Sequence, residues 1–425
     1  TPEATARPPK SGHAGRPAPM NAPSQRWTVL RLGTSQTLAW ASSYYLPAML
    51  AEPMARDLGV ATSAVFAAFS VALIVSALLG PMAGHTIDRH GGRPVLLATN
   101  VLFAAGLTAL ALAQGPVGLF AAWVLIGVAM GSGLYEAAFS TLVRLYADGA
   151  RGAISGITLL AGFASTVGWP LSAWMEGAYG WRGACLGWAA LHLLVGMPLN
   201  AWLPRATTLP RDITATGHQP SQAITTHVPP LTSPRRTAVL LSFVFAATWF
   251  ISTAMAAHLP RVLQTSGMPL HTAVAVAALV GPAQVVARLL EFGLLRRVHP
   301  LASARLAAMA HPLGGALLMA VGGPAGALFT VLHGAGNGIL TIAKGTLPLV
   351  LFGPLGYGVR QGLLMVPARV AQAFAPVLFG MLLDATGTAA VGLTAALGLA
   401  AALALWGLRP APVGHVPTPR EFPRT

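Results

Sequence analysis

Charged residues are scarce in this chain. Asp, Glu, Lys and Arg together make up 9% of its 425 residues, whereas a soluble globular domain carries about 25%. Hydrophobic residues make up 54%, and the mean hydropathy is +0.64. A soluble fold cannot bury so much apolar surface, so the composition predicts a protein whose solvent is largely lipid.

Cysteine is almost absent. Cys185 is the only one, which excludes an intramolecular disulfide framework, and we interpret it as a small packing residue in an apolar run. No His, Cys, Asp or Glu residues are spaced like metal ligands, and no Gly-rich phosphate loop of the Walker type is present. The sequence therefore predicts no metal, no other cofactor and no ATP-driven step.

Acidic residues are also few. The chain has 11 Asp and Glu against 26 Lys and Arg, which gives a formal net charge of +15. In a soluble protein such an excess would indicate a nucleic-acid partner. Here the basic residues flank apolar segments and do not alternate with aromatic residues in one patch, so we expect no nucleic-acid partner.

Apolar runs of the roughly 20 residues that cross a bilayer as a helix recur through the chain. They predict an all-α integral membrane protein with twelve transmembrane helices in two six-helix, pseudo-symmetric halves. The predicted segments are Trp27–Leu50, Ser63–Gly84, Pro94–Ala113, Val117–Val143, Ala153–Met175, Ala184–Leu203, Thr237–His258, His271–Leu295, Pro300–Gly322, Gly326–Val350, Val359–Leu383 and Ala389–Leu408.

The connections between these segments are short except for one polar, Pro- and Thr-rich stretch, which predicts a flexible linker. The run Thr1–Pro19 lacks the apolar core of a signal peptide, and Met20 is an alternative natural start. The predicted units are a disordered cytoplasmic tail at 1–26, an N-terminal half at 27–203, a cytoplasmic linker at 204–236, a C-terminal half at 237–408 and a cytoplasmic tail at 409–425.

The basic residues predict the orientation, because Lys and Arg accumulate in cytoplasmic loops. If the amino end is cytoplasmic, only Arg56, Arg182 and Arg261 fall on the outer side. Three more basic residues fall within the membrane, which leaves 20 of the 26 inside. We therefore expect both termini in the cytoplasm and an even number of spans.

The two halves resemble each other in sequence. GLYEAAFSTL begins at Gly133 and GILTIAKGTL begins at Gly338, an offset of 205 residues. Gly156 and Pro170 match Gly362 and Pro376 at an offset of 206. A nearly constant offset over two helices predicts a parallel six-plus-six repeat.

The loop after the second segment reads GPMAGHTIDRHGGRPVL. It resembles the loop between helices 2 and 3 of the major facilitator superfamily, here of bacterial type, although two adjacent basic residues are more usual where this chain has Arg93 and Pro94. The resemblance implies a conformational latch between the two halves in the outward-facing state. The residues that match this latch are Gly84, Asp88, Arg89, Gly91 and Arg93.

Five ionisable residues lie at membrane depth, where such residues are costly and often functional. Glu136 is the candidate for proton coupling, because desolvation makes protonation of a carboxylate accessible; pairing with Lys344 is the alternative. Arg288 and Glu291, three residues apart on one helix, either neutralise each other or face the path. Arg369 has no acid at helical spacing and is the best candidate for binding an anion.

Uncharged residues complete the candidate site. Trp40 and Tyr44 either line a cavity or join an interfacial belt. For three histidines in the predicted spans we expect hydrogen bonds between helices, with titration near pH 6–7 as the alternative, and these are His192, His311 and His333. The substrate-binding candidates are Arg369, Arg288, Lys344, Trp40, Tyr44, Gln36 and Asn337.

The resemblance implies a secondary active transporter that works by alternating access, with protons and a small molecule as its ligands. A slight excess of embedded cations favours an organic anion as substrate. The alternatives are a proton-driven exporter of hydrophobic drug-like compounds and a membrane sensor on a transporter scaffold; no set of side chains indicates an enzyme. We expect a monomer in a bacterial inner membrane, surrounded by the lipid bilayer.

Overall fold

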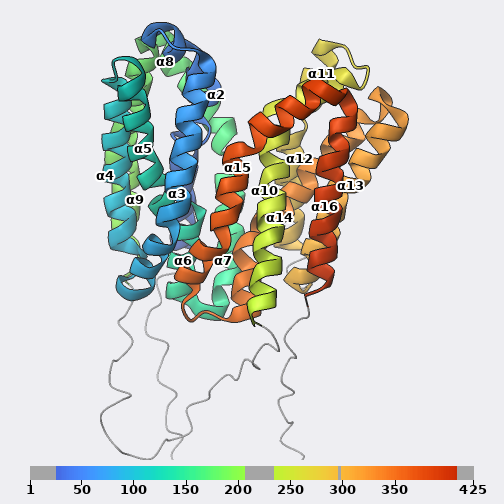
Figure 1. Cartoon of the computed structure of the whole chain (residues 1–425). Coiled ribbons are helices and arrows are strands. Elements are labelled where there is room, and N and C mark those ends of the chain that lie inside the picture. The colour runs from blue at the N-terminus through green and yellow to red at the C-terminus, as the bar shows by residue number, and fades with distance from the viewer. Residues whose placement is uncertain (1–24, 206–233, 295–297, 409–425) are drawn as a thin grey trace, which may run out of the picture.

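The computed structural model describes residues 25–205, 234–294 and 298–408. Helices make up nearly all of these ranges and no strand occurs in them, which agrees with the predicted all-α class. Figure 1 shows two groups of helices side by side. We call residues 25–205 the N-terminal bundle and residues 234–294 with 298–408 the C-terminal bundle. Both predicted tails, most of the predicted linker, and Arg296 and Arg297 lie outside the described residues.

The helices follow one another with short connections. The N-terminal bundle consists of α1 (Gln25–Ala41), α2 (Leu46–Leu58), α3 (Thr62–His90), α4 (Gly92–Ala111), α5 (Gly115–Gly133), α6 (Tyr135–Tyr146), α7 (Ala150–Ala161), α8 (Ala164–Leu191) and α9 (Met197–Ala201). The C-terminal bundle consists of α10 (Pro234–Thr265), α11 (Leu270–Ala277), α12 (Val280–Gly293), α13 (Pro300–Val321), α14 (Gly326–Phe352), α15 (Tyr357–Thr386) and α16 (Val391–Trp406).

The described residues contain nine helical stretches that are long and apolar enough to cross a membrane. Two of them, Ala150–Ala201 and Tyr357–Trp406, have 52 and 50 residues, more than twice the roughly 20 that one crossing needs. Gly180, with φ of 69°, interrupts the first of these stretches, within the predicted short connection at Tyr179–Ala184. The count of twelve spans stays a prediction, because length and composition alone define these stretches.

Several predicted spans are broken helices. The span predicted at Trp27–Leu50 consists of α1 and α2, separated by a turn at 42–45. The imidazole of His192 lies beside this turn, with its Nε2 2.7 Å from Ser42 Oγ and its Nδ1 3.0 Å from Asn100 Oδ1. This network confirms the hydrogen bonds that we expected for His192. It satisfies polar groups that a break exposes at membrane depth.

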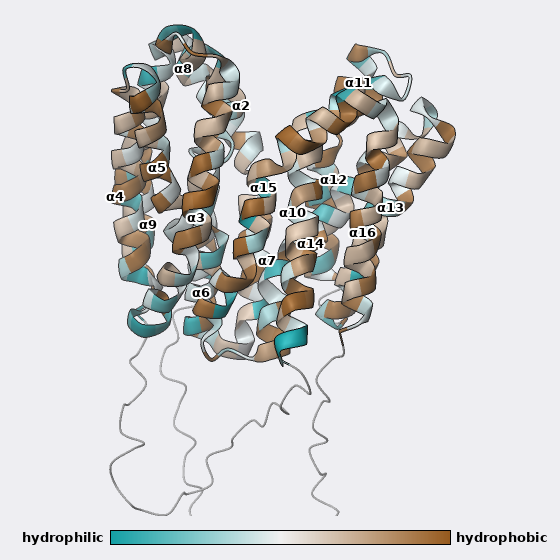
Figure 2. Ribbon diagram, viewed as in Figure 1, coloured by the Kyte–Doolittle hydropathy of each residue, from teal (hydrophilic) through white to brown (hydrophobic). Residues whose placement is uncertain are grey.

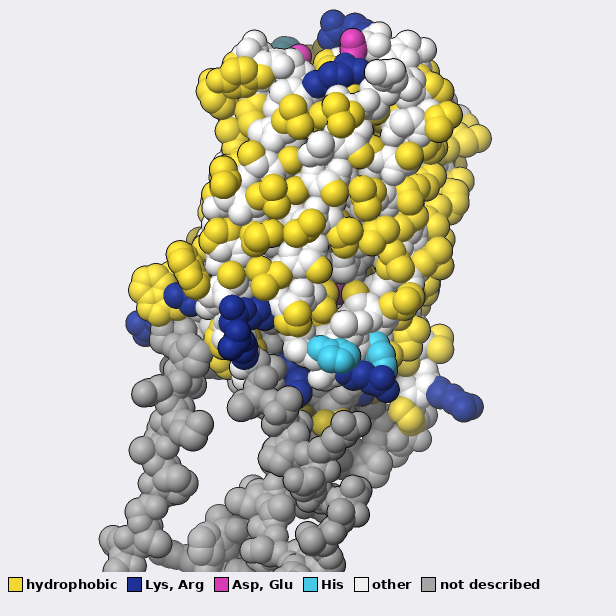
Figure 3. Space-filling view, turned by 90° about the vertical axis from the view of Figure 1, so that its left-hand side faces the viewer, with side chains coloured by type: hydrophobic (Ala, Val, Ile, Leu, Met, Phe, Trp, Pro, Cys, Tyr) yellow, Lys and Arg dark blue, Asp and Glu magenta, His cyan; other side chains and the backbone are white. Residues whose placement is uncertain are grey.

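Charge divides unequally between the two ends of the molecule. Both described chain ends, Gln25 and Leu408, lie at the lower end in Figure 1, which we call the basic end. On the face drawn in Figure 3, Lys and Arg side chains gather near this end and apolar side chains cover most of the surface between the two ends, where the ribbon of Figure 2 is coloured largely hydrophobic. At the opposite end each described arginine is paired with an acid, and the pairs are Arg56–Glu52, Arg182–Asp57 and Arg261–Asp384.

The two bundles pack against each other mainly through α3 with α15 and through α7 with α12 and α14. Glycines allow α3 and α15 to approach closely: a Cβ added to Gly362 would lie 2.6 Å from the Cα of Pro81. In Figure 1 the ribbons of the two bundles come together toward the basic end and diverge toward the opposite end. The residues that connect the bundles therefore lie at mid-depth and at the basic end.

Candidate functional site

A buried ion pair connects the two bundles. Nη2 of Arg369 on α15 lies 3.0 and 2.9 Å from the two carboxylate oxygens of Glu136, which stands in the first turn of α6. The sequence suggested Lys344 as the partner of Glu136, and the structure places Arg369 there instead. The two residues are 233 positions apart, and only the packing of α6 beside α15 brings them together.

Arg369 is held on several sides. Its Nη1 donates a hydrogen bond to Oε1 of Gln372 at 2.9 Å. Its guanidinium carbon lies 5.9 Å from the ring centroid of Trp40 and 5.4 Å from that of Trp249. Cation–π contacts of this kind stabilise a buried positive charge, most strongly over tryptophan. Arg369 is therefore a fixed positive group between indoles from both bundles.

Lys344 on α14 carries a second buried positive group. Its Nζ lies 4.1 Å from the ring centroid of Trp249 and has no hydrogen-bond partner among the described residues. It lies within electrostatic range of Arg369, Glu136 and Arg288. An ammonium in an apolar interior without a hydrogen-bonded counterion is costly, so this position suits an anion that arrives from outside the protein.

Arg288 and Glu291 do not neutralise each other. Arg288 donates to the carbonyl oxygen of Thr158 and to Oε1 of Gln284, both at 3.2 Å. Glu291 instead pairs with Arg151 at 3.8 Å. The two side chains stand three residues apart on α12, and each finds a separate partner on α7. Arg288 therefore keeps its charge within range of Lys344, and Glu291 does not compensate it.

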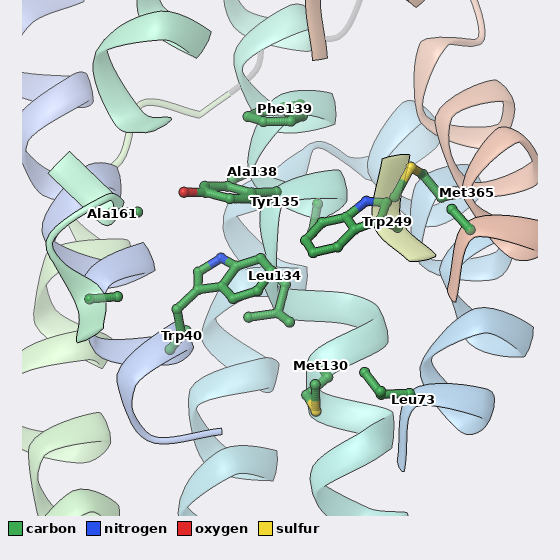
Figure 4. Close-up of a cluster of buried hydrophobic side chains, with 14 of the residues drawn as sticks. Trp40, Leu73, Met130, Leu134, Tyr135, Ala138, Phe139, Ala161, Trp249 and Met365 are labelled. Carbon is green, nitrogen blue, oxygen red and sulfur yellow. The ribbon is translucent and has the colours of Figure 1, made fainter. Parts of the chain in front are cut away.

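Aromatic side chains surround these charges. Trp40 of α1 stacks on Trp249 of α10 with 6.2 Å between centroids and lies 4.8 Å from Tyr135 (Figure 4). Tyr135 stacks in turn on Phe139 at 5.2 Å. Trp40 thus lies among the residues around the buried charges and not in an interfacial belt, which was the other interpretation of the sequence. Sequence reasoning did not select Trp249, although the 205-residue offset of the repeat maps Tyr44 onto it.

The remaining candidates lie at different distances from the charges. The hydroxyl of Tyr44 lies 3.4 Å from Thr253 Oγ1 of α10, and its ring contacts that of Trp249. Gln36 donates to the carbonyl oxygen of Gly133 at 2.7 Å and so joins α1 to the end of α5. Asn337 lies apart from the site: it lines a cavity inside the C-terminal bundle, between α10, α13, α14 and α16.

The residues predicted as a latch lie at the basic end of α3. The two carboxylate oxygens of Asp88 accept hydrogen bonds from the backbone N–H groups of Gly358 and Val359, at 2.9 and 3.0 Å. These groups belong to the first turn of α15, where the helix dipole favours a negative charge. The partners of Asp88 are thus backbone amides, and Arg360 lies within electrostatic range.

The other latch residues differ in their roles. Gly84 is in contact with the backbone of Gly358, so that a side chain here would separate α3 from α15. Gly91 has φ of 82°, which glycine adopts without strain, and it ends α3. Arg89 is exposed and Arg93 is partly buried, and neither makes a salt bridge within the described part of the chain.

A helical membrane fold with buried charges at the contact of two bundles is the architecture of a membrane transport protein. The chain belongs to the Major Facilitator Superfamily, because the model of that family matches residues 32–343, more than half of its length. It is therefore a multi-pass membrane transporter and not an enzyme.

Relatives in sequence match shorter parts of the chain. An uncharacterized 38 kDa protein from Thermoproteus tenax is 36% identical over 152 residues, 36% of this chain and 40% of that protein. The oxalate:formate antiporter of Oxalobacter formigenes is 29% identical over 133 residues, 31% of each chain. The chain thus matches less than half of the length of these relatives.

Solved structures resemble the whole fold. The proton:xylose symporter XylE superposes with a TM-score of 0.73 at 16% identity, covering 92% of this chain and 97% of its own. The human organic anion transporter MFSD10 gives a TM-score of 0.65 at 17% identity, with 90% and 100% covered. FucP in its outward conformation gives 0.66 at 16% identity, with 89% and 98% covered. At these identities the likeness concerns the fold alone.

Proposed function

We propose that this protein is a secondary active transporter of a small organic anion, coupled to protons. The proposal rests on the buried ammonium of Lys344, which lies beside the Arg369–Glu136 pair and has no hydrogen-bonded partner in the part of the chain that the structure describes. A carboxylate that entered between Lys344 and Arg369 would supply the missing counterion, with indole rings on either side of it.

The balance of charge at the site supports an anion. Two cations, Arg288 and Arg369, lie within electrostatic range of Lys344, and Glu136 is the one acid that does so among the described residues. This positive excess disfavours lipophilic cations, a common class of exported drugs. The names of two similar proteins, an oxalate:formate antiporter and an organic anion transporter, agree with a carboxylate substrate.

Glu136 is the proposed proton carrier. Its carboxylate and a substrate carboxylate would both bind the guanidinium of Arg369, so the two compete for one group. Protonation of Glu136 removes its charge and frees Arg369 for the substrate. A proton and an anion would then bind together. When both have left, Glu136 again pairs with Arg369, and the guanidinium of Arg369 is compensated in the empty protein.

The contacts that join the two bundles support alternating access. Asp88 with the first turn of α15, and Arg151 with Glu291, close the basic end. Opening this end would break both contacts while the central site remains near mid-depth. The ribbons diverge at the opposite end (Figure 1), which supports an outward-facing state in which Gly84, Asp88, Arg89, Gly91 and Arg93 act as the latch.

The distribution of arginines supports an orientation with the basic end in the cytoplasm. Both termini would then be cytoplasmic, in a bacterial inner membrane, and we propose that the monomer is the functional unit. A small cavity beside Glu136 and Arg369, lined by residues of α3, α5, α6 and α15, supports a site within one chain.

The experiment uses proteoliposomes that enclose a pH-sensitive dye. A proton gradient is imposed, and oxalate, formate, succinate and then lipophilic cations are added to wild type, Glu136→Gln and Lys344→Met. We expect one carboxylate to dissipate the gradient with wild type and with neither variant. Arg56→Gln, at the exposed opposite end, serves as the control and should behave as wild type.

Dissipation by lipophilic cations but by no carboxylate would refute the anion proposal and favour a drug exporter. Transport by Glu136→Gln with the pH dependence of wild type would refute the proton role of Glu136. If wild type moved no compound yet was stabilised thermally by a carboxylate, a sensor on a transporter scaffold would be the better interpretation.

A further inference from the structure

Two histidines lie in contact inside the C-terminal bundle, away from the ion pair. Nδ1 of His311 on α13 lies 3.0 Å from Nδ1 of His333 on α14, and both side chains are buried. Two nitrogens at this distance form a hydrogen bond only if one carries a proton and the other a lone pair. The pair therefore holds one proton between its two Nδ1 atoms.

A cavity adjoins this pair. It lies between α10, α13, α14 and α16 and has room for about one water molecule. Its polar lining consists of both histidines, Thr248 and Asn337. Nε2 of His311 is buried and has no hydrogen-bond partner among the described residues. A polar cavity with several hydrogen-bonding groups is of the kind that holds water, and water here would reach the free Nε2.

We propose that the His311–His333 pair is a second proton-binding site of this transporter, which exchanges its proton with water in the adjoining cavity. In the tautomer in which the Nδ1–H of His311 donates to His333, Nε2 of His311 is a free acceptor and takes up the proton. The His311 ring becomes an imidazolium and keeps its hydrogen bond, now charge-assisted and therefore stronger. Transfer of the Nδ1 proton to His333 would move the charge across the pair without loss of the contact.

No other charge competes with this pair. The cavity lining from α10, α13, α14 and α16 contains no further titratable side chain. Among the described residues, the electrostatic partner of His311 is His333, and His333 has no other. On α12, which also packs on α14, Arg288 points toward Thr158 of α7. The protonation of the pair is therefore set by its own hydrogen bond, its burial and the water of the cavity.

The histidine pair is connected through two helices to the site formed by Glu136, Lys344 and Arg369. His333 and Lys344 are eleven residues apart on α14, three helical turns, and thus share one face. On α10, Thr248 lines the cavity while the next residue, Trp249, contacts the ammonium of Lys344. A charge on the pair that shifts α14 or α10 would also move the anion site. This coupling rests on the proposed transport function; the proton site itself does not.

The proton site is tested without any substrate. Protein with ¹⁵N-labelled histidine in lipid nanodiscs is titrated from pH 8 to pH 4 by NMR, as wild type, His311→Asn and His333→Asn. Asn places an amide near the position of Nδ1 and can keep the contact, but it cannot take up the proton. We expect wild type to show a ring that becomes doubly protonated, with a signal that both variants lose. Two rings that stay neutral over the whole range would overturn the proposal.

Coupling is tested in proteoliposomes, with the membrane potential clamped and with the carboxylate that wild type transports. A gradient of one pH unit supports about tenfold accumulation if one proton moves with each anion. If protonation of the pair is required for coupling through Glu136, His311→Asn should exchange the carboxylate at equal pH and lose the accumulation; His271→Asn, exposed on α11, should keep both. Unchanged accumulation by His311→Asn would overturn the coupling. Absence of exchange by wild type would instead refute the proposed function and leave the NMR result standing.

Discussion

Asp88 offers the sharpest test of how the basic end is closed. Its carboxylate accepts two backbone hydrogen bonds, from Gly358 and Val359 at the start of α15. These bonds exist only while α3 and α15 are in contact. In the state that is open at the basic end, water would replace both donors. Replacing Asp88 therefore destabilises the closed state and leaves the open state nearly unchanged.

The size of the effect follows from the two bonds. A hydrogen bond to a charged group contributes about 1.5–3 kcal/mol when buried, and the helix dipole adds about 0.3–1 kcal/mol at an exposed site. Asp88 is only partly buried, so we take about 2 kcal/mol for Asp88→Ala, a roughly 30-fold change in the ratio of the two states. Asp88→Asn keeps one acceptor oxygen and should shift the ratio by roughly fivefold.

The assay is the accessibility of a cysteine to a maleimide. The one native cysteine, Cys185, is buried, so the background is low. Met365→Cys on α15 is buried at the contact with α3, beside Gly80 and Glu136. Its labelling from the basic end should rise strongly with Asp88→Ala and about fivefold with Asp88→Asn. Equal labelling of all three proteins would refute the latch reasoning, and Arg56→Gln, exposed at the opposite end, is the control.

Three further predictions follow. Glu136→Gln leaves the guanidinium of Arg369 buried without its counterion and should lower the stability by about 3–5 kcal/mol, which a thermal melt measures. The double variant Glu136→Gln with Arg369→Gln should lose less stability than the sum of the losses of the two single variants. Gly84→Ala should weaken the contact of α3 with α15 and raise labelling from the basic end, as Asp88→Ala does. Burial and two nearby arginines lower the pKa of His299 from 6.5, so its contribution to stability is present above pH 6.5 and is lost as the pH falls.

Each of the predictions for Glu136, Gly84 and His299 has a result that would contradict it. Additive losses for the Glu136 and Arg369 variants would show that the two side chains do not interact. Unchanged labelling in Gly84→Ala would mean that the helices tolerate a methyl group there. For His299, whose Nδ1 accepts the N–H of Leu301 at the start of α13, the control is His299→Asn, which can accept the same bond and does not titrate. The same loss of stability at low pH in that variant would exclude His299 as its cause.

Local sequence predicted most of the helices but not their breaks. The apolar run predicted as Trp27–Leu50 crosses a turn at 42–45 that separates α1 from α2, because Ser42 is held by His192 from another helix. The run predicted as His271–Leu295 is likewise divided, at 278–279, into α11 and α12, and its last residue lies outside the described ranges. Hydropathy measures whether a segment belongs in lipid, and it does not detect a tertiary contact that stabilises a turn within it.

The sequence by itself determined the lipid environment, the helical class, the family and the identity of the buried charges. Each of these depends on composition or on a local pattern, such as the loop around Asp88. Only the tertiary structure decided which charges meet: Glu136 with Arg369, Glu291 with Arg151, and Lys344 with none within the described residues. These partners depend on how closely α6 approaches α15 and α7 approaches α12, which is set by packing between residues more than one hundred positions apart. Helical periodicity carries no information about contacts at that separation.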